Sequence, residues 1–289
     1  MRRFDDYPTD VVDPDAPRKP TNVVGDIVVE IAPDGEVLRQ WKLFDLVDPY
    51  RFGYGSLEVG YWVGTYEDHY DEPPVDWHHA NAVYYDEQTD SAIISTYQMS
   101  AIYKLNLGSG ELDWIMSDPT GWREPWSKLL LEPVGDMLWT YGQHAPMITP
   151  QRTLLVYDNG WIRAVPPNPP LQRGEDSFSR AVEFEIDATN GTVRQVWSFG
   201  GPGEDWFMSP FISEADWMPE TGNVLVLSGG RVTRVDGSVG FAPFEGHIWI
   251  TLAEVTHTTP AEKVWEVIID DPAVSWASYR IERVPSLYP

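Results

Sequence analysis

The sequence predicts an all-β protein, and more narrowly a β-propeller built from four-stranded antiparallel blades. Three observations predict this fold: a hairpin pattern that recurs four times, two further strands before most of the hairpins, and a scarcity of helical pattern. The 23 glycines and 25 prolines spread along the 289 residues favour short strands and many turns over long helices. About four blades are therefore visible in this sequence.

Each copy of the hairpin consists of an alternating strand, a turn and a second alternating strand that ends near a tryptophan. Alternation of apolar and polar side chains indicates strands with one face buried. Asp-Gly or Asn-Gly at a turn is a strong hairpin signal. The four predicted hairpins span residues 27–41, 102–114, 182–197 and 248–265.

Two more short strands are expected before the second, third and fourth hairpins. These predicted inner strands cover 82–85 and 92–96, then 145–148 and 153–157, then 211–217 and 223–227. Two inner strands and one outer hairpin make a four-stranded meander, which is the blade of a propeller. Helical turns are expected only at 43–47 and 127–131, and long loops at 52–74 and 166–172.

The two ends of the sequence leave the ring of blades incomplete. The first hairpin has no inner strands before it, and residues 275–284 are expected to form a strand with no hairpin after it. Either the two ends pair in a composite blade that closes the ring, or the first blades lie outside this sequence. In the second case, exposed sheet faces would favour a homo-oligomer. The predicted organisation is an N-terminal arm at 1–24 and the propeller at 25–289.

The composition argues against several classes of function. A net charge of −25 makes nucleic acid and anionic membrane surfaces unfavourable partners, because like charges repel. The absence of cysteine excludes disulfides, thiolate metal sites and cysteine nucleophiles. The first residues lack the apolar stretch of a signal peptide, and no run approaches the roughly 18 apolar residues of a membrane span. The composition does not identify the compartment.

The candidate chemistry centres on two of the six histidines. Neither the spacing of a helical zinc site nor a nucleotide-binding glycine loop occurs, so no metal and no cofactor are expected. Residues 76–82 and 141–144 each stand directly before the innermost strand of a blade, which places them at one end of the central channel. His79 and His144 are therefore expected to face one ligand, although a histidine at such a position also serves as a hydrogen-bonded channel lining.

The sequence Asp-Trp-His-His-Ala-Asn at 76–81 resembles the Asp-Trp-x-His-x-Asn motif of the bacterial arylsulfate sulfotransferases. Further segments are similar to that family and follow in the same order. They are residues 25–41, 43–45, 48–51, 82–86, 90–95, 100–104, 121–130, 143–144, 157–160, 179–183 and 195–197. The resemblance runs from about residue 24 to about residue 210, and its ordered motifs make it far more specific than one short pattern.

The resemblance implies a six-bladed propeller that transfers sulfuryl groups between phenols without a nucleotide donor or a cofactor. The partners it implies are a small aryl sulfate donor and a phenol acceptor. His144 would attack the aryl sulfate and carry the group as a sulfohistidine in a ping-pong mechanism. His79 and Asn81 would hold the sulfuryl oxygens, whose negative charge is stabilised during transfer as in phosphoryl transfer. Members of this family are mostly periplasmic or secreted.

Two departures from the family pattern leave the activity open. Residues 97–98 are Tyr-Gln where the family has Arg-His, and a family histidine well upstream of the motif has no counterpart. Tyr97 would offer a hydroxyl donor but no fixed charge, so Arg123 or Arg180 would have to supply the charge. Trp77 is expected to stack on a phenol ring. These four side chains make up the expected substrate-binding set.

Two other functions are therefore retained as alternatives to the transferase. One is a non-catalytic propeller that binds a ligand or another protein and has lost part of the active site. The other is a related propeller hydrolase or lyase that uses the same channel. Convergence of Asn81, Tyr97, His144 and Arg180 on one small anion would favour the transferase.

Overall fold

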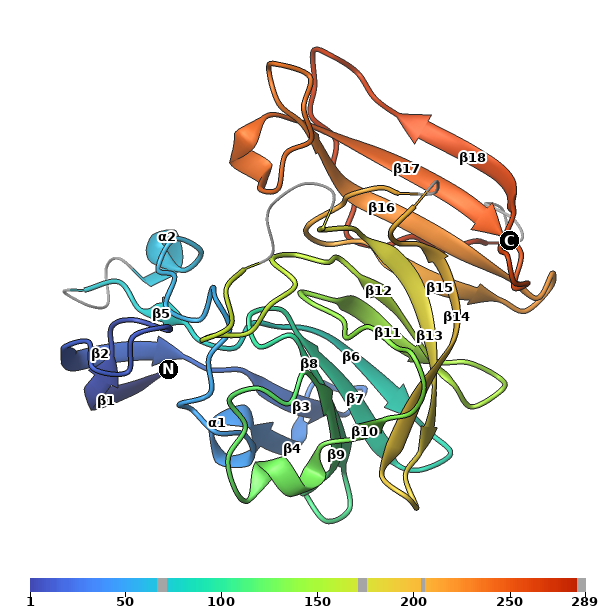
Figure 1. Cartoon of the computed structure of the whole chain (residues 1–289). Helices are drawn as coiled ribbons and strands as arrows, with labels where there is room; N and C mark the ends of the chain where they lie inside the picture. The colour runs from blue at the N-terminus through green and yellow to red at the C-terminus, as the bar shows by residue number, and fades with distance from the viewer. Residues whose placement is uncertain (67–71, 171–175, 204–205, 285–289) are drawn as a thin grey trace.

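The computed structural model of the chain describes residues 1–66, 72–170, 176–203 and 206–284. Over these residues the protein is all-β, as predicted, and its helices are single turns (Figure 1). They are α1 (Leu43–Leu46), α2 (Val63–Tyr66) and the 3₁₀ turns η1 (Trp126–Leu129) and η2 (Pro243–Glu245). The turns expected at 43–47 and 127–131 are thus confirmed by α1 and η1. In the described ranges no helix has the length and hydropathy needed to cross a membrane.

Three sheets contain the four-stranded antiparallel meanders that the sequence predicts. The first consists of β6 (Ala80–Asp86), β7 (Ser91–Thr96), β8 (Ala101–Asn106) and β9 (Leu112–Ser117). The second consists of β11 (His144–Ile148), β12 (Leu154–Asp158), β13 (Arg180–Asp187) and β14 (Thr192–Gly200), with β10 (Glu132–Pro133) added in parallel to β14. The third consists of β15 (Glu214–Met218), β16 (Asn223–Thr233), β17 (His247–Val255) and β18 (Lys263–Ile269).

The N-terminal part of the chain forms two smaller sheets. The first predicted hairpin is β3 (Ile27–Ile31) and β4 (Val37–Lys42), which pair only with each other among the described strands. The arm forms a second hairpin, β1 (Arg2–Pro8) and β2 (Arg18–Val24). β2 also pairs in parallel with β5 (Val75–Asp76), so the arm supports the segment that leads to His79.

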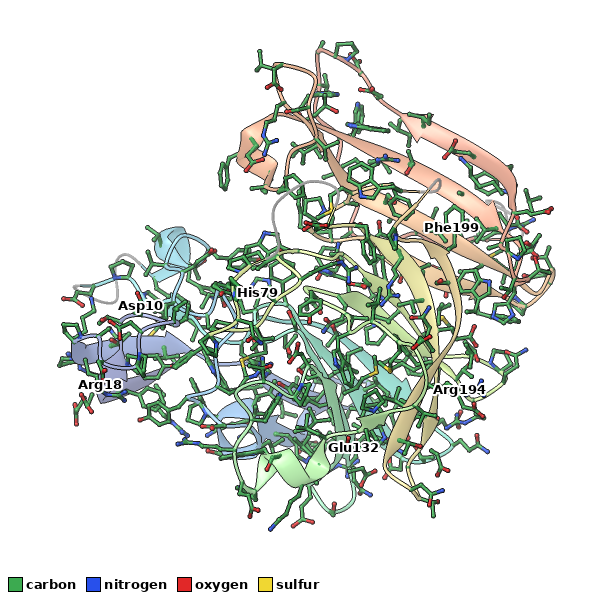
Figure 2. The ribbon with its side chains drawn as sticks, in the orientation of Figure 1. Asp10, Arg18, His79, Glu132, Arg194 and Phe199 are labelled. Atoms are coloured by element: carbon green, nitrogen blue, oxygen red, sulfur yellow. The ribbon has the colours of Figure 1, made fainter. Side chains whose placement is uncertain are left out.

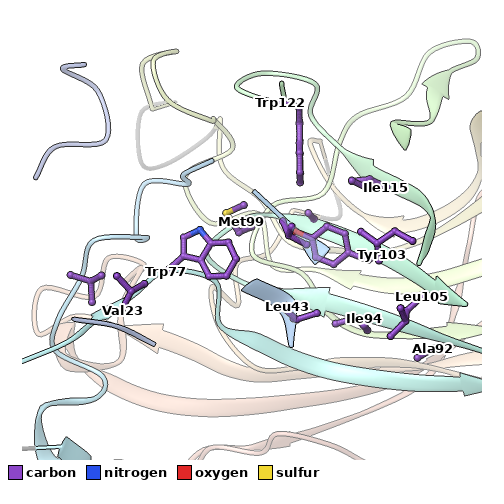
Figure 3. Packing of buried hydrophobic residues seen from close by; sticks show 14 of the residues in the cluster. Val23, Leu43, Trp77, Ala92, Ile94, Met99, Tyr103, Leu105, Ile115 and Trp122 are labelled. Carbon is purple, nitrogen blue, oxygen red and sulfur yellow. The ribbon is translucent and has the colours of Figure 1, made fainter. Parts of the chain in front are cut away.

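Consecutive sheets pack face to face because their central strands are apolar on both faces. In β7, Ala92 and Ile94 lie in the buried cluster shown in Figure 3, and the partly buried Val28 and Trp41 of the β3–β4 hairpin pack against this cluster. Ile93 between them belongs to the cluster shared with the second sheet. In the same way, β12 directs Leu154 toward the first sheet and Leu155 toward the third. Successive side chains of a strand point to opposite faces, so one buried strand supports two interfaces.

Residues 275–284 correct one of the predictions. They do not form a strand, and the chain start and chain end do not pair in a composite blade within the described residues. Residues 276–281, which we name the crossing segment, run instead from the third sheet to the first. The Tyr279 hydroxyl donates a 2.8 Å hydrogen bond to the backbone oxygen of Asn81 in β6. Face-packed meanders are the packing expected of blades, and no sheet in the described part closes on itself.

Candidate active site

His144 begins β11, and its buried ring is held by two oxygen atoms. Its Nδ1 lies 2.8 Å from Asn159 Oδ1 and 3.1 Å from the backbone oxygen of Gly142. The Asn159 amide nitrogen donates to the backbone oxygens of Ser209 and Ile212, each at 2.7 Å, which fixes its oxygen toward the ring. Because both neighbours of Nδ1 are acceptors, Nδ1 carries the proton and Nε2 keeps its lone pair.

The environment of His144 favours the neutral imidazole. Burial lowers the pKa of His144 to about 4, and the positive charges of His79 and Arg280 act in the same direction. The hydrogen bonds to Asn159 and Gly142 oppose this shift but do not cancel it. Near neutral pH the ring therefore presents an unprotonated nitrogen, which is the form that a nucleophile requires.

His79 is partly buried and lies beside a carboxylate. Its Nδ1 lies 2.6 Å from Asp76 Oδ2, and Asp76 also accepts a 2.8 Å hydrogen bond from Trp62 Nε1 through its other oxygen. Burial opposes the protonated form of His79, but the hydrogen bond and charge of Asp76, helped by Asp26, raise its pKa. The site thus combines a neutral imidazole with one whose protonated form is favoured.

The backbone at both histidines is irregular in a way that turns their side chains. His79 has φ 54° and Ala145, directly after His144, has φ 51°, both in the left-handed region that non-glycine residues rarely adopt. The strand register shifts at the same places, between Ala80 and Ala82 and between His144 and Met147. Such bulges re-aim side chains next to active sites.

The structure brings the two rings together around Tyr97. The Tyr97 ring centroid lies 5.9 Å from that of His79 and 5.5 Å from that of His144. Figure 2 labels His79 near the junction of the arm with the larger sheets. The Tyr97 hydroxyl donates to the backbone oxygen of Pro210 at 3.0 Å, and burial raises its pKa, with Glu58 adding to the shift. The residue expected to offer a hydroxyl to substrate therefore contributes a partly buried ring between the two histidines instead.

Asn81 links the segments that carry the two histidines. Its amide nitrogen donates 2.8 Å to the backbone oxygen of Gln143, which directly precedes His144. Its side-chain oxygen is buried and has no hydrogen-bond partner among the described residues. One amide hydrogen and the oxygen thus remain for a ligand.

The other three residues of the expected substrate-binding set lie elsewhere. Trp77 is fully buried in the core, stacked on Phe44, so no phenol can reach its ring. Arg123 pairs with Asp48 at 2.7 Å and lines a cavity beside the N-terminal arm. Arg180 is buried and donates to Asp158 Oδ2, Gln195 Oε1 and the backbone oxygen of Leu138. Its donors are therefore committed to the protein.

The Asp158 carboxylate forms ion pairs with two buried arginines. Its removal should therefore lower the free energy of unfolding. Its Oδ2 accepts from Arg163 at 2.8 Å and from Arg180 at 2.9 Å, and all three side chains are buried. We expect Asp158→Asn to lower the free energy of unfolding by about 3–5 kcal/mol, because both guanidinium groups lose their counter-charge. Chemical denaturation monitored by circular dichroism measures this change. Asp187→Asn in an exposed turn is the matched control, and equal stability of the two variants would contradict the prediction.

Three residues that the sequence analysis did not single out, Asn159, Tyr279 and Arg280, also lie at the candidate site. Asn159 belongs to the family-like segment 157–160 and directly follows β12. Because β12 pairs with β11, the predicted strand order could have placed Asn159 close to His144. Tyr279 and Arg280 are almost two hundred residues from Asn81 in sequence, and no local pattern connects them to it. In the part of the chain that the structure describes, no group of three or more His, Asp or Glu residues could hold a metal ion.

Comparisons with known proteins agree with the ordered motifs. The sequence profile of the family described as Arylsulfotransferase (ASST) matches residues 10–277. The arylsulfate sulfotransferase AssT of Escherichia coli O6:H1 strain CFT073 is 28% identical over 251 residues, covering 74% of this chain and 41% of that protein. The arylsulfate sulfotransferase AssT of Lelliottia amnigena is 27% identical over 248 residues, covering 72% of this chain and 40% of that protein. The chain thus spans about two fifths of the length of these curated relatives.

Proposed function

The chain belongs to the arylsulfotransferase family, and from this premise we propose that it transfers a sulfuryl group from an aryl sulfate to a phenolic acceptor. The observation that carries the proposal is the state of His144: a buried, neutral imidazole whose Nδ1–H is held by Asn159 and whose Nε2 keeps its lone pair. Such a nitrogen accepts a sulfuryl group and releases it again, which divides one displacement into two.

The proposed reaction proceeds in two balanced steps. In the first, a nitrogen–sulfur bond forms between His144 Nε2 and the donor, and the sulfur–oxygen bond to the aryl oxide breaks. The sulfohistidine keeps its Nδ1–H, so Asn159 Oδ1 stabilises the positive charge that develops on the ring. In the second step the acceptor oxygen attacks sulfur, the nitrogen–sulfur bond breaks, and the phenolic proton passes to solvent.

His79 and Asn81 are proposed to stabilise the sulfuryl oxygens during both steps. The charge of the transferring group is spread over these oxygens, and donors aimed at them lower the barrier. His79 brings a favoured positive charge, and Asn81 brings the amide hydrogen that Gln143 leaves unused. Tyr97 acts in this proposal as the apolar wall between the two histidines, because its hydroxyl is bound to Pro210.

The pH dependence of kcat/KM should reflect the opposite shifts of the two histidines. His144 must be neutral to attack, and its pKa is lowered to about 4, so the acid limb should lie near pH 4 rather than at 6.5. His79 must be protonated, and its pKa is raised, so the alkaline limb should lie above 6.5. Initial rates of nitrophenol release from pH 3.5 upward measure the profile, with circular dichroism to verify folding. An acid limb near pH 6.5 would contradict these assignments.

The direct test of the proposal is a transfer assay with 4-nitrophenyl sulfate and phenol. We expect release of nitrophenol that depends on the protein, and a mass increase of one SO3 group on the peptide that contains His144 when the acceptor is omitted. A folded protein that shows neither would exclude the transferase.

A non-catalytic ligand-binding function is the second candidate, and Tyr97 is the observation that favours it. No charge is available from Tyr97, and its hydroxyl is bound to Pro210. We expect that a protein with this function would bind aryl sulfates without turnover. Activity that appears only in Tyr97→Arg would support the binding function, whereas turnover by the unsubstituted protein would exclude it.

A further inference from the structure

The crossing segment (residues 276–281) holds a fixed course over the third sheet. The backbone nitrogen of Trp276 donates to Ile248 O at 2.9 Å, and that of Ser278 donates to Gly229 O at 3.1 Å. Gly229 permits this close approach, since a Cβ there would lie 1.8 Å from Ser278 O. The segment is therefore seated by backbone contacts before it reaches the candidate site.

Beyond Ser278 the crossing segment lies directly against the candidate site. The Tyr279 hydroxyl bonds the backbone of Asn81 at 2.8 Å, and the Tyr279 ring meets that of His144 at 5.6 Å between centroids. The backbone nitrogen of Ile281 donates to Glu214 Oε2 at 2.8 Å. Arg280 is thus held between two anchored neighbours, one of which touches both Asn81 and His144.

The guanidinium of Arg280 is half-exposed and has spare donors. Its Nη1 pairs with Glu214 Oε1 at 3.0 Å, and its Nε and Nη2 donate to no atom within the described ranges. Arg280 also borders two cavities. One, of about 810 Å³, is lined by Asn81 as well, and the other, of about 460 Å³, is lined by Ala145 next to His144. Arg280 is therefore within reach of a small ligand in either cavity.

Neither arginine expected from the sequence combines free donors with a place at the candidate site. Arg180 is buried and shares the carboxylate of Asp158 with Arg163. Arg123 pairs with Asp48 beside the N-terminal arm. Arg280 combines spare donors, exposure and contact with the walls of the candidate site.

We infer that Arg280 is the residue that recognises the anionic sulfate group of aryl sulfate esters at this site. The inference rests on the proposed function for the choice of ligand. A guanidinium binds an oxyanion through two parallel N–H groups, and Arg280 has Nε and Nη2 available for that geometry. The positive charge of Arg280 also helps to lower the pKa of His144, so its field reaches the proposed nucleophile.

Phenyl sulfate and phenol are the matched ligands for the test, because they differ only in the sulfate group. By isothermal titration calorimetry, we expect Arg280→Met to weaken binding of phenyl sulfate roughly 10- to 100-fold, the range for one hydrogen-bonded charge, and to leave phenol unchanged. Arg280→Lys should retain most of the affinity. Glu214→Gln, which releases the guanidinium from its carboxylate, should bind phenyl sulfate at least as tightly as the unsubstituted protein.

A purely structural role for Arg280 makes the opposite prediction. Arg280→Met and Glu214→Gln would then weaken both ligands alike, because each breaks the anchor of the crossing segment, and this result would overturn the inference. Equal affinity of the unsubstituted protein for phenyl sulfate and phenol would overturn it as well. If Arg280→Met does not fold, the Glu214→Gln titration decides. Tight binding of phenyl sulfate without turnover of 4-nitrophenyl sulfate would remove the proposed transfer and leave this recognition standing.

Discussion

Replacing His144 with glutamine should abolish sulfuryl transfer while the fold persists. The glutamine side chain has no basic nitrogen, so the intermediate cannot form, and turnover should fall by roughly three orders of magnitude or more. The peptide that contains residue 144 should no longer gain the mass of SO3 when the acceptor is omitted. Initial rates with 4-nitrophenyl sulfate, together with mass spectrometry of the acceptor-free reaction, measure both effects.

His247→Gln is the matched control for this experiment. His247 lies in β17 and pairs with Asp270 at the surface, on the outer part of the third sheet. Its substitution should leave both turnover and labelling unchanged. If His144→Gln still gains the mass of SO3, another residue carries the group, and the assignment of His144 is wrong.

Substituting Asn159 with leucine should have the second largest effect, although Asn159 is not expected to touch the sulfuryl group. Without the Asn159 oxygen, the Nδ1–H of His144 keeps only one acceptor, the backbone oxygen of Gly142. The tautomer with a free lone pair on Nε2 is then less strongly favoured. Loss of tautomer control at a catalytic histidine costs up to roughly 10⁴ in kcat, so we expect a decrease of roughly 10²- to 10⁴-fold. Asn168→Leu, at an exposed position, is the control for the substitution itself.

Asn159→Asp separates this role from a structural one. A carboxylate at position 159 places a negative charge against Nδ1 and should raise the pKa of His144 above about 4. Since only the neutral ring attacks, the acid limb of kcat/KM should move to higher pH. A merely structural Asn159 would lower the rate without moving that limb, and an unmoved limb would therefore refute the proposed role.

The strands could be predicted from the sequence because their information is local. Residues 92–94 are apolar on both faces, and hairpins such as 102–114 carry their own turn residues. The strand predicted at 275–284 was wrong, although apolar and polar residues alternate there as they do in a strand. The backbone there bonds to single carbonyls of Ile248 and Gly229 and to a Glu214 carboxylate, so no ladder forms.

The positions of the two histidines could be predicted because equivalent places in successive repeats converge. The ion-pair partners of the arginines could not be predicted, because these partners depend on which carboxylate is buried nearby. Asp158 takes Arg180 together with Arg163, a choice that no spacing in the sequence reveals. The burial of Trp77 could not be predicted either, because it results from stacking on Phe44, and this stacking prevents contact with a ligand.

The hydrogen bond from Tyr279 to Asn81 joins residues separated by 198 positions. A contact this distant in the chain has a high entropic cost of loop closure and favours late formation during folding. During synthesis, the first two meanders can fold before Tyr279 leaves the ribosome, but Arg280, which lines the cavity beside Asn81, cannot yet be in place. Ligand affinity should therefore develop after most of the secondary structure, as a late kinetic event.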